Sequence, residues 1–223
     1  MFNGGLAQVS ATGAEGAIWS GALSSACRLC SRSELFTMSC ASLAVELVYE
    51  ILDYVISVPT DIFEDAGPIS PFAHTKTSTA LYLCVSRSWA VAGEPLLYKT
   101  VVLRRSPQAA ALLRTFQARP QLGRYVRRLR IEGPYSSFIV GIVRVAPGIT
   151  DLCFTLRAWS DTPTTGLIQA LQLLDPIRVQ LTLAPRQDLK NRCHLQLVAA
   201  VGTQIALWTR LVSVMITPSR SLV

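Results

Sequence analysis

A short unit recurs through the second half of the chain: a helix-like segment, a turn, and a short apolar run of strand character. Three of these runs share the spacing apolar-x-x-apolar-x-apolar. They are Val126/Leu129/Ile131, Ile149/Leu152/Phe154 and Leu211/Val214/Ile216, and a fourth run extends from Ile177 to Leu181. A unit of one helix and one strand cannot bury its apolar face alone, so units of this kind must stack on their neighbours.

The separation of equivalent residues indicates the kind of stack. Leu129 to Leu152 is 23 residues, Leu152 to Val179 is 27, and Val179 to Val214 is 35. The first two separations fit the range of about 20 to 29 residues that is typical of leucine-rich repeats. We therefore predict an irregular leucine-rich-repeat-like α/β solenoid over Ser106 to Thr217. The alternative is a compact mixed α/β domain built from the same four strands.

Strand side chains alternate between two faces, so the residues between the repeated apolar positions should lie on the open face of the sheet. A mixed polar face of this kind suits a peptide or protein target. The alternative is a set of solvated strand residues with no ligand. The predicted target-binding residues are Arg128, Arg130, Asp151, Arg178 and Gln180.

The stretch from Leu43 to Leu103 begins with an amphipathic helix that should start after Ser42, a good capping residue type, and end before Pro59. The acidic, Pro-rich segment from Val58 to Thr75 predicts an exposed loop. Glu94 to Leu103 should turn into a strand. The helix carries one apolar stripe, formed by Leu47, Val48, Ile51, Leu52 and Val55. Its opposite face is acidic and carries Glu46, Glu50 and Asp53.

A combination of residues in a particular order runs through the same stretch: Leu43, Glu46-Leu47, Ile51-Leu52, Val85-Ser86-Arg87, Trp89 and Pro95-Leu96-Leu97-Tyr98. This combination resembles an F-box, in the form common in mushroom-type fungal proteins. Two features depart from the family pattern. Ala44 stands where a proline usually opens the helix, which removes some preorganisation, and the connection from Val58 to Thr75 is longer than the family's.

The resemblance implies a non-catalytic substrate-recognition adaptor of an SCF-type ubiquitin ligase. The F-box would dock on the Skp-type adaptor of a cullin scaffold, and the repeats would hold a protein target. The implied Skp-binding residues are Leu43, Leu47, Ile51, Val85 and Trp89. The expected organisation is a poorly structured segment at 1–40, a helical F-box-like module at 41–103 and a repeat-like region at 104–223.

The net charge of +7 is unevenly distributed. Arg104 to Ile131 contains eight arginines and no acid, whereas Leu43 to Asp65 contains six acids and no base. An unopposed arginine run can contact phosphates, so a nucleic-acid-binding module through Arg104 to Arg130 is one alternative function, although only Phe116 and Tyr125 interleave it. A truncated structural fragment is another, because no polar capping unit follows the last strand before Val223.

Other classes of function find little support in the sequence. No apolar run approaches the roughly 18 residues of a membrane helix. His74 and His194 have no catalytic setting and no phosphate-binding glycine loop is present, so we expect neither catalysis nor a cofactor. The Cys27-Arg-Leu-Cys30 pair has no second pair to complete a metal site. Scattered cysteines, with Cys84 and Cys153 in apolar runs, indicate free thiols in the cytoplasm or nucleus.

Overall fold

The computed structural model describes residues 43–67, 69–73, 79–132, 137–156, 164–183 and 191–218. The predicted segment at 1–40, with Cys27 and Cys30, and His74 lie outside these residues. The first part of the described chain is helical. It contains α2 (Val45–Ile56), α3 (Thr60–Phe63), the 3-10 helix η1 (Thr79–Cys84) and α4 (Arg87–Lys99).

The rest of the chain alternates strands with helices and forms a mixed α/β domain with a five-stranded, all-parallel sheet. The strands are β1 (Thr100–Leu103), β2 (Arg128–Ile131), β3 (Asp151–Thr155), β4 (Arg178–Leu183) and β5 (Ser213–Pro218). The connecting helices are α5 (Ser106–Ala118), η2 (Pro120–Tyr125), α6 (Phe138–Val145), α7 (Thr165–Leu171) and α8 (Arg192–Leu207). The α/β class is therefore confirmed.

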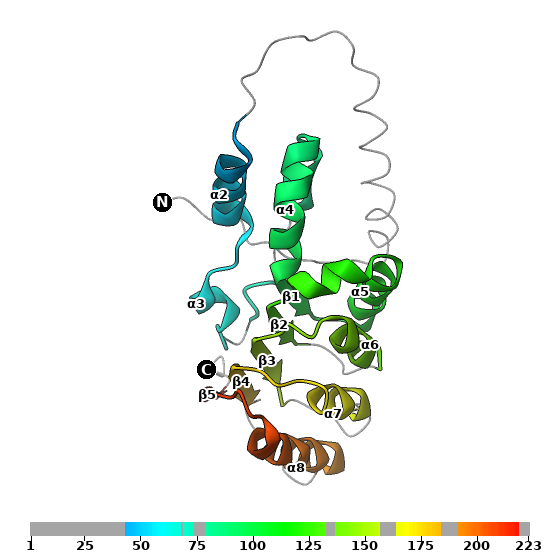
Figure 1. The fold of residues 1–223 in the computed structure, drawn as a ribbon. Helices are drawn as coiled ribbons and strands as arrows, with labels where there is room; N and C mark the ends of the chain where they lie inside the picture. The colour runs from blue at the N-terminus through cyan, green and yellow to red at the C-terminus, as the bar shows by residue number, and fades with distance from the viewer. Residues whose placement is uncertain are drawn as a thin grey trace.

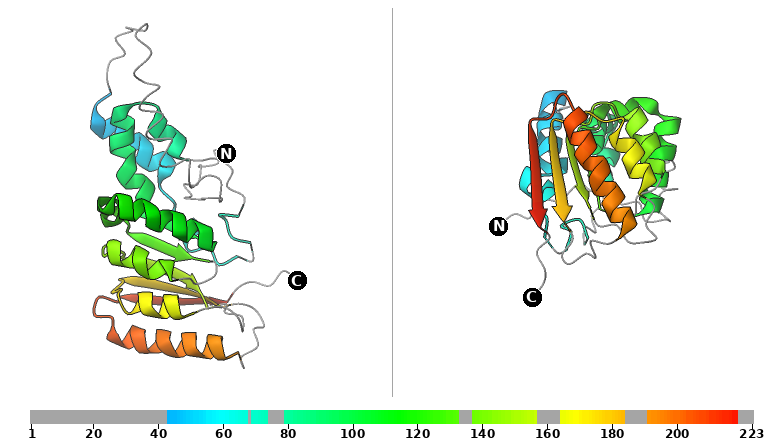
Figure 2. Two further views of the ribbon diagram at one scale, coloured as in Figure 1. Left: turned by 90° about the vertical axis from the view of Figure 1, so that its right-hand side faces the viewer. Right: turned by 90° about the horizontal axis from the view of Figure 1, so that it is seen from below.

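Strand order across the sheet follows chain order from β1 to β5, and α5 to α8 lie side by side on one face of the sheet (Figures 1 and 2). Parallel neighbours need a crossover connection, and each helix supplies one. The repeated apolar positions are in register: Leu129 pairs with Leu152, Leu152 with Val179, and Val179 with Val214. The recurring spacing in the sequence thus marks equivalent positions of neighbouring strands.

A single hydrophobic core runs from α2 through the sheet to α8. At its N-terminal end, α2 packs against α4 and buries Val48, Leu52 and Ile56. Gly93 of α4 lies at this contact, where an added Cβ would stand 3.2 Å from methyl carbons of both Leu52 and Leu83. The missing side chain lets α2, α4 and η1 approach closely, so the helical part and the sheet share one apolar interior.

The predicted strand over Glu94 to Leu103 is wrong in its first half, because α4 continues to Lys99 and only Thr100–Leu103 is extended. The helix tolerates Pro95 in its interior and buries Leu96 and Leu97 on the core side. β1 then joins the sheet beside β2. The predicted module boundary at residue 103 therefore falls between β1 and the other strands of its own sheet.

The predicted exposed loop after α2 is also wrong in part. Residues 58–67 and 69–72, which we call the strap, cross the sheet face opposite α5 to α8 and include α3 (Figure 2). Val58, Phe63 and Phe72 of the strap are buried and belong to the hydrophobic core. Apolar anchors inside a Pro-rich acidic segment thus hold it against the sheet rather than in solvent.

We predict that Phe63→Ala lowers the free energy of unfolding by about 3 to 5 kcal/mol, the usual cost of truncating a buried phenylalanine. Chemical denaturation followed by circular dichroism measures the change. Ile69→Ala is the matched control on the same strap, because Ile69 is exposed and its truncation should change stability by less than about 0.5 kcal/mol. Equal denaturation midpoints for the two variants would contradict a packed strap.

Candidate functional site

The predicted apolar stripe of α2 is divided between two faces. Val48, Leu52 and Ile56 face α4 and are buried. Leu43, Leu47 and Ile51, three of the predicted Skp-binding residues, remain 50%, 54% and 42% exposed. Large apolar side chains that stay in water along one helix face form a surface that a partner can cover.

Tyr54 extends this exposed row and was not among the predicted site residues. It is 85% exposed. Residues 47, 51 and 54 follow one another at steps of four and three, which places them on one face of α2, and Leu43 continues the row just before the helix begins. We call this row the α2 stripe. The same helical spacing in the sequence would have identified Tyr54 as its fourth member.

Val85 and Trp89, the remaining predicted Skp-binding residues, lie at the start of α4 and have different surroundings. Val85 is 59% exposed and precedes the helix. Trp89 is partly buried and packs on the core, and its backbone N–H donates to the capping Oγ of Ser86 at 3.3 Å. Trp89 therefore shapes the helical part from inside, whereas Val85 adds to its exposed apolar surface together with Leu81 and Val91.

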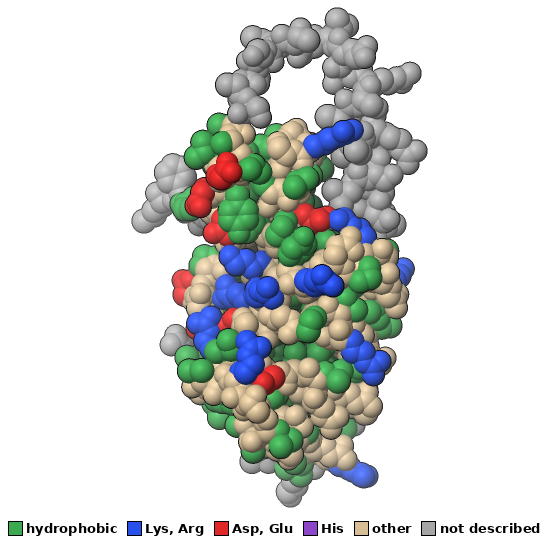
Figure 3. Space-filling model, viewed as in Figure 1, with side chains coloured by type: hydrophobic (Ala, Val, Ile, Leu, Met, Phe, Trp, Pro, Cys, Tyr) green, Lys and Arg blue, Asp and Glu red, His purple; other side chains and the backbone are tan. Residues whose placement is uncertain are grey.

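Acidic side chains flank the apolar surface of α2, and basic side chains form a band across the middle of the molecule (Figure 3). Glu46 and Glu50 are exposed on α2, as the sequence pattern predicted. Asp53 forms a 3.3 Å ion pair with Lys99 of α4. Surface ion pairs of this kind contribute little stability, so the packing of α2 on α4 rests on its buried apolar residues.

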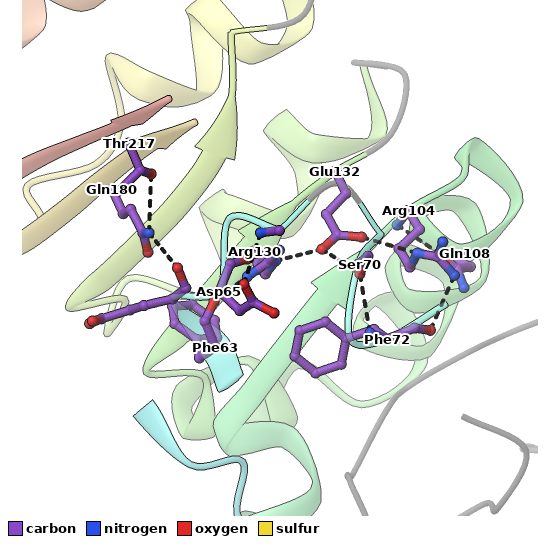
Figure 4. Close-up of polar contacts among 12 residues, drawn as sticks. Phe63, Asp65, Ser70, Phe72, Arg104, Gln108, Arg130, Glu132, Gln180 and Thr217 are labelled. Atoms are coloured by element: carbon purple, nitrogen blue, oxygen red, sulfur yellow. Dashed lines mark hydrogen bonds and ion pairs between the residues drawn. The ribbon is translucent and has the colours of Figure 1, made fainter. Parts of the chain in front are cut away.

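Arg128 and Arg130 of the predicted target-binding face hold the strap. Arg128 donates a hydrogen bond to the carbonyl of Val58 at 2.6 Å, and its guanidinium lies 4.1 Å from the ring centroid of Phe63. Arg130 donates to the carbonyls of Phe63 and Asp65 (Figure 4). Burial lowers the pKa of Arg128 from its ordinary value, although the nearby carboxylates of Asp151 and Glu64 oppose this effect.

The far end of the strap is held by a second group of side chains (Figure 4). Glu132 accepts from Ser70 Oγ at 2.8 Å and from Arg104 Nε at 3.0 Å. Arg104 also donates to the carbonyl of Phe72 at 3.1 Å, and the Arg130 guanidinium lies 5.3 Å from the Phe72 ring centroid. Side chains around β1 and β2 thus form hydrogen bonds with the strap and contact its aromatic rings.

The other predicted target-binding residues lie on β3 and β4. Gln180 donates to the carbonyl of Glu64 in the strap at 2.5 Å. Asp151 is buried and forms an ion pair with Arg178, whose side chain is half exposed. The structure therefore brings all five residues to one face, as predicted. It also engages Arg128, Arg130 and Gln180 with the protein's own strap, and target binding by these residues stays a prediction.

The arginine run of residues 104–130 is not a uniform basic surface. Arg104 and Arg119 form ion pairs with Glu132 and Glu94, and Arg128 and Arg130 lie under the strap. The arginines left exposed are Arg105, Arg114, Arg124 and Arg127. Of these, Arg127 also donates to the carbonyl of Gly148, so contacts within the protein occupy more than half of the run.

Cys153 and His194 are buried, whereas Cys84 is exposed. Cys153 of β3 is 2% exposed, and burial raises the pKa of its thiol to about 11. Cys84 and Cys153 are both free thiols. His194 is buried and its Nδ1 lies 3.0 Å from the carbonyl oxygen of Leu156. Among the described residues no cluster of His, Cys, Asp or Glu could hold a metal ion, and no helix there is long and apolar enough to cross a membrane.

Comparison with known proteins gives no match: no family model, no curated protein and no solved structure is similar to this chain. We therefore infer the function from two surfaces of the molecule, the α2 stripe and the strap-covered face of the sheet.

We predict that Cys153 resists alkylation in the native protein while Cys84 reacts. Cys153 pairs in register with Arg130 and Gln180, both of which hold the strap, and a buried thiol with a raised pKa provides little thiolate at pH 8. Iodoacetamide labelling with peptide mass mapping measures both sites. Phe63→Ala should accelerate labelling of Cys153 and leave Cys84 unchanged. Equal rates at the two thiols of the native chain would show that the strap does not protect this face.

Proposed function

We propose that this protein is a non-catalytic substrate-recognition adaptor of an SCF-type ubiquitin ligase. The helical part docks on a Skp-type adaptor carried by a cullin scaffold, and the α/β part holds the protein target. The observation that carries the proposal is the α2 stripe: Leu47, Ile51 and Tyr54 are left in water on a helix whose opposite side is packed against α4, and Leu43 is exposed just before this helix.

Two further features support the proposal. The residues that resemble an F-box fall on α2, on the start of α4 and on its end, and these helices pack together. Strand order follows chain order with α5 to α8 on one face, which is the arrangement that a leucine-rich-repeat-like solenoid requires. We include that finer fold in the proposal.

The site of action in the proposal is the cytoplasm or the nucleus. Cys84 and Cys153 are free thiols in the structure, which suits a reducing compartment. An interface of the expected kind buries on the order of 1,600 Å² in total, and a few apolar or aromatic anchors supply most of the affinity. Leu47, Ile51 and Tyr54 are the anchors that α2 offers.

We predict that the double substitution Leu47→Ala with Ile51→Ala abolishes co-purification with a Skp-type adaptor. Both side chains are exposed, so their truncation should shift the free energy of unfolding by less than about 1 kcal/mol. Leu207→Ala is the control, because Leu207 is an exposed leucine on α8. Undiminished co-purification of the double variant would refute the docking role of α2.

The nucleic-acid alternative makes a different prediction, which concerns salt. An apolar docking surface should keep its affinity for the adaptor when sodium chloride rises from about 50 to about 500 mM, whereas phosphate binding would weaken steeply. Arg124→Gln with Arg127→Gln removes two exposed arginines and should leave adaptor binding unchanged in fluorescence anisotropy. Tight, salt-sensitive binding of a labelled single-stranded or duplex oligonucleotide that these variants lose would favour the alternative.

A further inference from the structure

The two edges of the sheet differ in burial. Strand β1 is buried at all four positions, whereas five of the six residues of β5 are exposed. Ile216 of β5 is 58% exposed, although Leu181, its partner in register on β4, is 3% exposed. Among the described strands β5 pairs only with β4, so its outer edge presents backbone N–H and C=O groups that no described strand satisfies.

The β5 edge lacks the features that usually prevent an exposed strand from pairing with another chain, such as a lysine or a central proline. β5 contains no charged residue, and Pro218 is its last residue. The surrounding end of the molecule is also uncharged: between Cys193 and Pro218 the only Asp, Glu, Lys or Arg is Arg210. Because the whole chain carries a charge of +7, two copies repel each other least at this end.

The helix that precedes β5 exposes an apolar row of its own. The row lies roughly a quarter turn from the buried residues Leu197 and Val201, on a flank of α8 that α7 leaves open. At Gly202, in the middle of the row, an added Cβ would meet nothing within 4 Å. The members of the row follow one another at steps of three, four and four: Leu195, Val198, Gly202 and Ala206.

The sequence of β5 is complementary to itself when two copies of the strand run antiparallel. With Met215 opposite Met215 of the second copy, Val214 lies opposite Ile216, and Ser213 lies opposite Thr217. Directly opposite residues share one face of a sheet and interact as pairs. Apolar side chains therefore meet on one face, and methionines and hydroxyls meet on the other, without a charge on either.

The geometry of strands and helices favours the same register. Pro218, which cannot donate to a strand pairing, stays outside the paired segment 213–217. Neighbouring strands lie about 4.8 Å apart, so a helix centred over β4 and β5 lies roughly 10 Å from its counterpart in the second copy. Packed helices are about 8 to 10 Å apart, so the two α8 rows come into contact. One twofold axis at Met215 thus serves both layers.

We propose that β5 and α8 form a twofold interface between two copies of this chain, with the β5 strands antiparallel and paired about Met215. The interface lies at the end of the molecule opposite α2 (Figure 1), so both α2 stripes stay accessible, and the inference does not depend on the proposed function. A pocket of about 260 Å³ on the strap-covered face, which Ser213 and Met215 help to line, opens on the same side of the joined sheet in both copies.

Size-exclusion chromatography with multi-angle light scattering of the full chain, from micromolar to sub-millimolar concentration, tests the interface. We expect a mass of about twice 24.3 kDa for the native chain. Met215→Lys should be monomeric, because two like charges would lie directly opposite each other at the axis. Gln196→Lys is the matched control: it adds the same charge at an exposed site on α8 outside the apolar row, and it should remain a dimer.

A charge exchange separates self-pairing from a folding defect. Met215→Asp alone should also be monomeric, and an equimolar mixture of the Asp and Lys variants should form a dimer again, because opposite charges then meet at the axis. Circular dichroism spectra of both variants should match that of the native chain. A native chain that is monomeric at every concentration would overturn the proposal and leave the β5 edge to a strand of another protein. A dimer that survives both substitutions, or a mixture that stays monomeric, would also overturn it.

Discussion

Two guanidinium groups on one strand connect the helical part of this protein to its sheet. Arg128 and Arg130 lie under the strap, stack on Phe63 and Phe72, and donate to strap carbonyls. A buried charge needs partners to offset its lost hydration. Backbone carbonyls and aromatic faces meet part of that need, and Glu132 adds an ion pair to Arg130. Because the strap follows directly from α2, these contacts also fix where α2 lies relative to the sheet.

This arrangement has a consequence for the proposed adaptor. A substrate-recognition subunit must hold its target at a defined place relative to the ligase, since the reaction depends on proximity. The shared core and the strap make the docking helix and the target face one rigid unit rather than two modules on a flexible linker. The strap also covers much of the sheet face opposite α5 to α8. In the proposal, target recognition therefore concentrates at β4 and β5, where Gln180 and Ser213 line an open pocket.

Periodicity in the sequence predicted much of the sheet. The apolar spacing around Leu129, Leu152 and Val214 identified strands that the structure places in register, and the helix-like segments between them became α5 to α8. β1 was assigned to the helical module, because the apolar residues of Glu94 to Leu103 are compatible with a helix and with a strand, and local pattern cannot place the boundary between the two. Pairing with β2, a long-range contact, decides where the helix ends.

The strap could not be predicted from local pattern. Prolines and acids at residues 58–75 are typical of a solvated loop, and nothing nearby indicates that Phe63 and Phe72 are buried. The sequence does contain aromatic residues in an acidic segment and, far along the chain, unopposed arginines on a strand. Local pattern cannot show that these two groups contact each other. Helical spacing identified Leu47 and Ile51 of the α2 stripe, but it grouped them with Val48 and Leu52. Spacing alone does not show which side of a broad apolar face a neighbouring helix will cover.

We propose above that the α2 stripe docks on a Skp-type adaptor. Isothermal titration calorimetry of the full chain with a purified Skp-type adaptor, repeated at several temperatures, tests this docking. We expect one-to-one binding with a negative change in heat capacity, the signature of buried apolar surface, and no binding by the Leu47→Ala/Ile51→Ala variant. An absence of binding by the native chain, or binding of equal strength by the double variant, would contradict it.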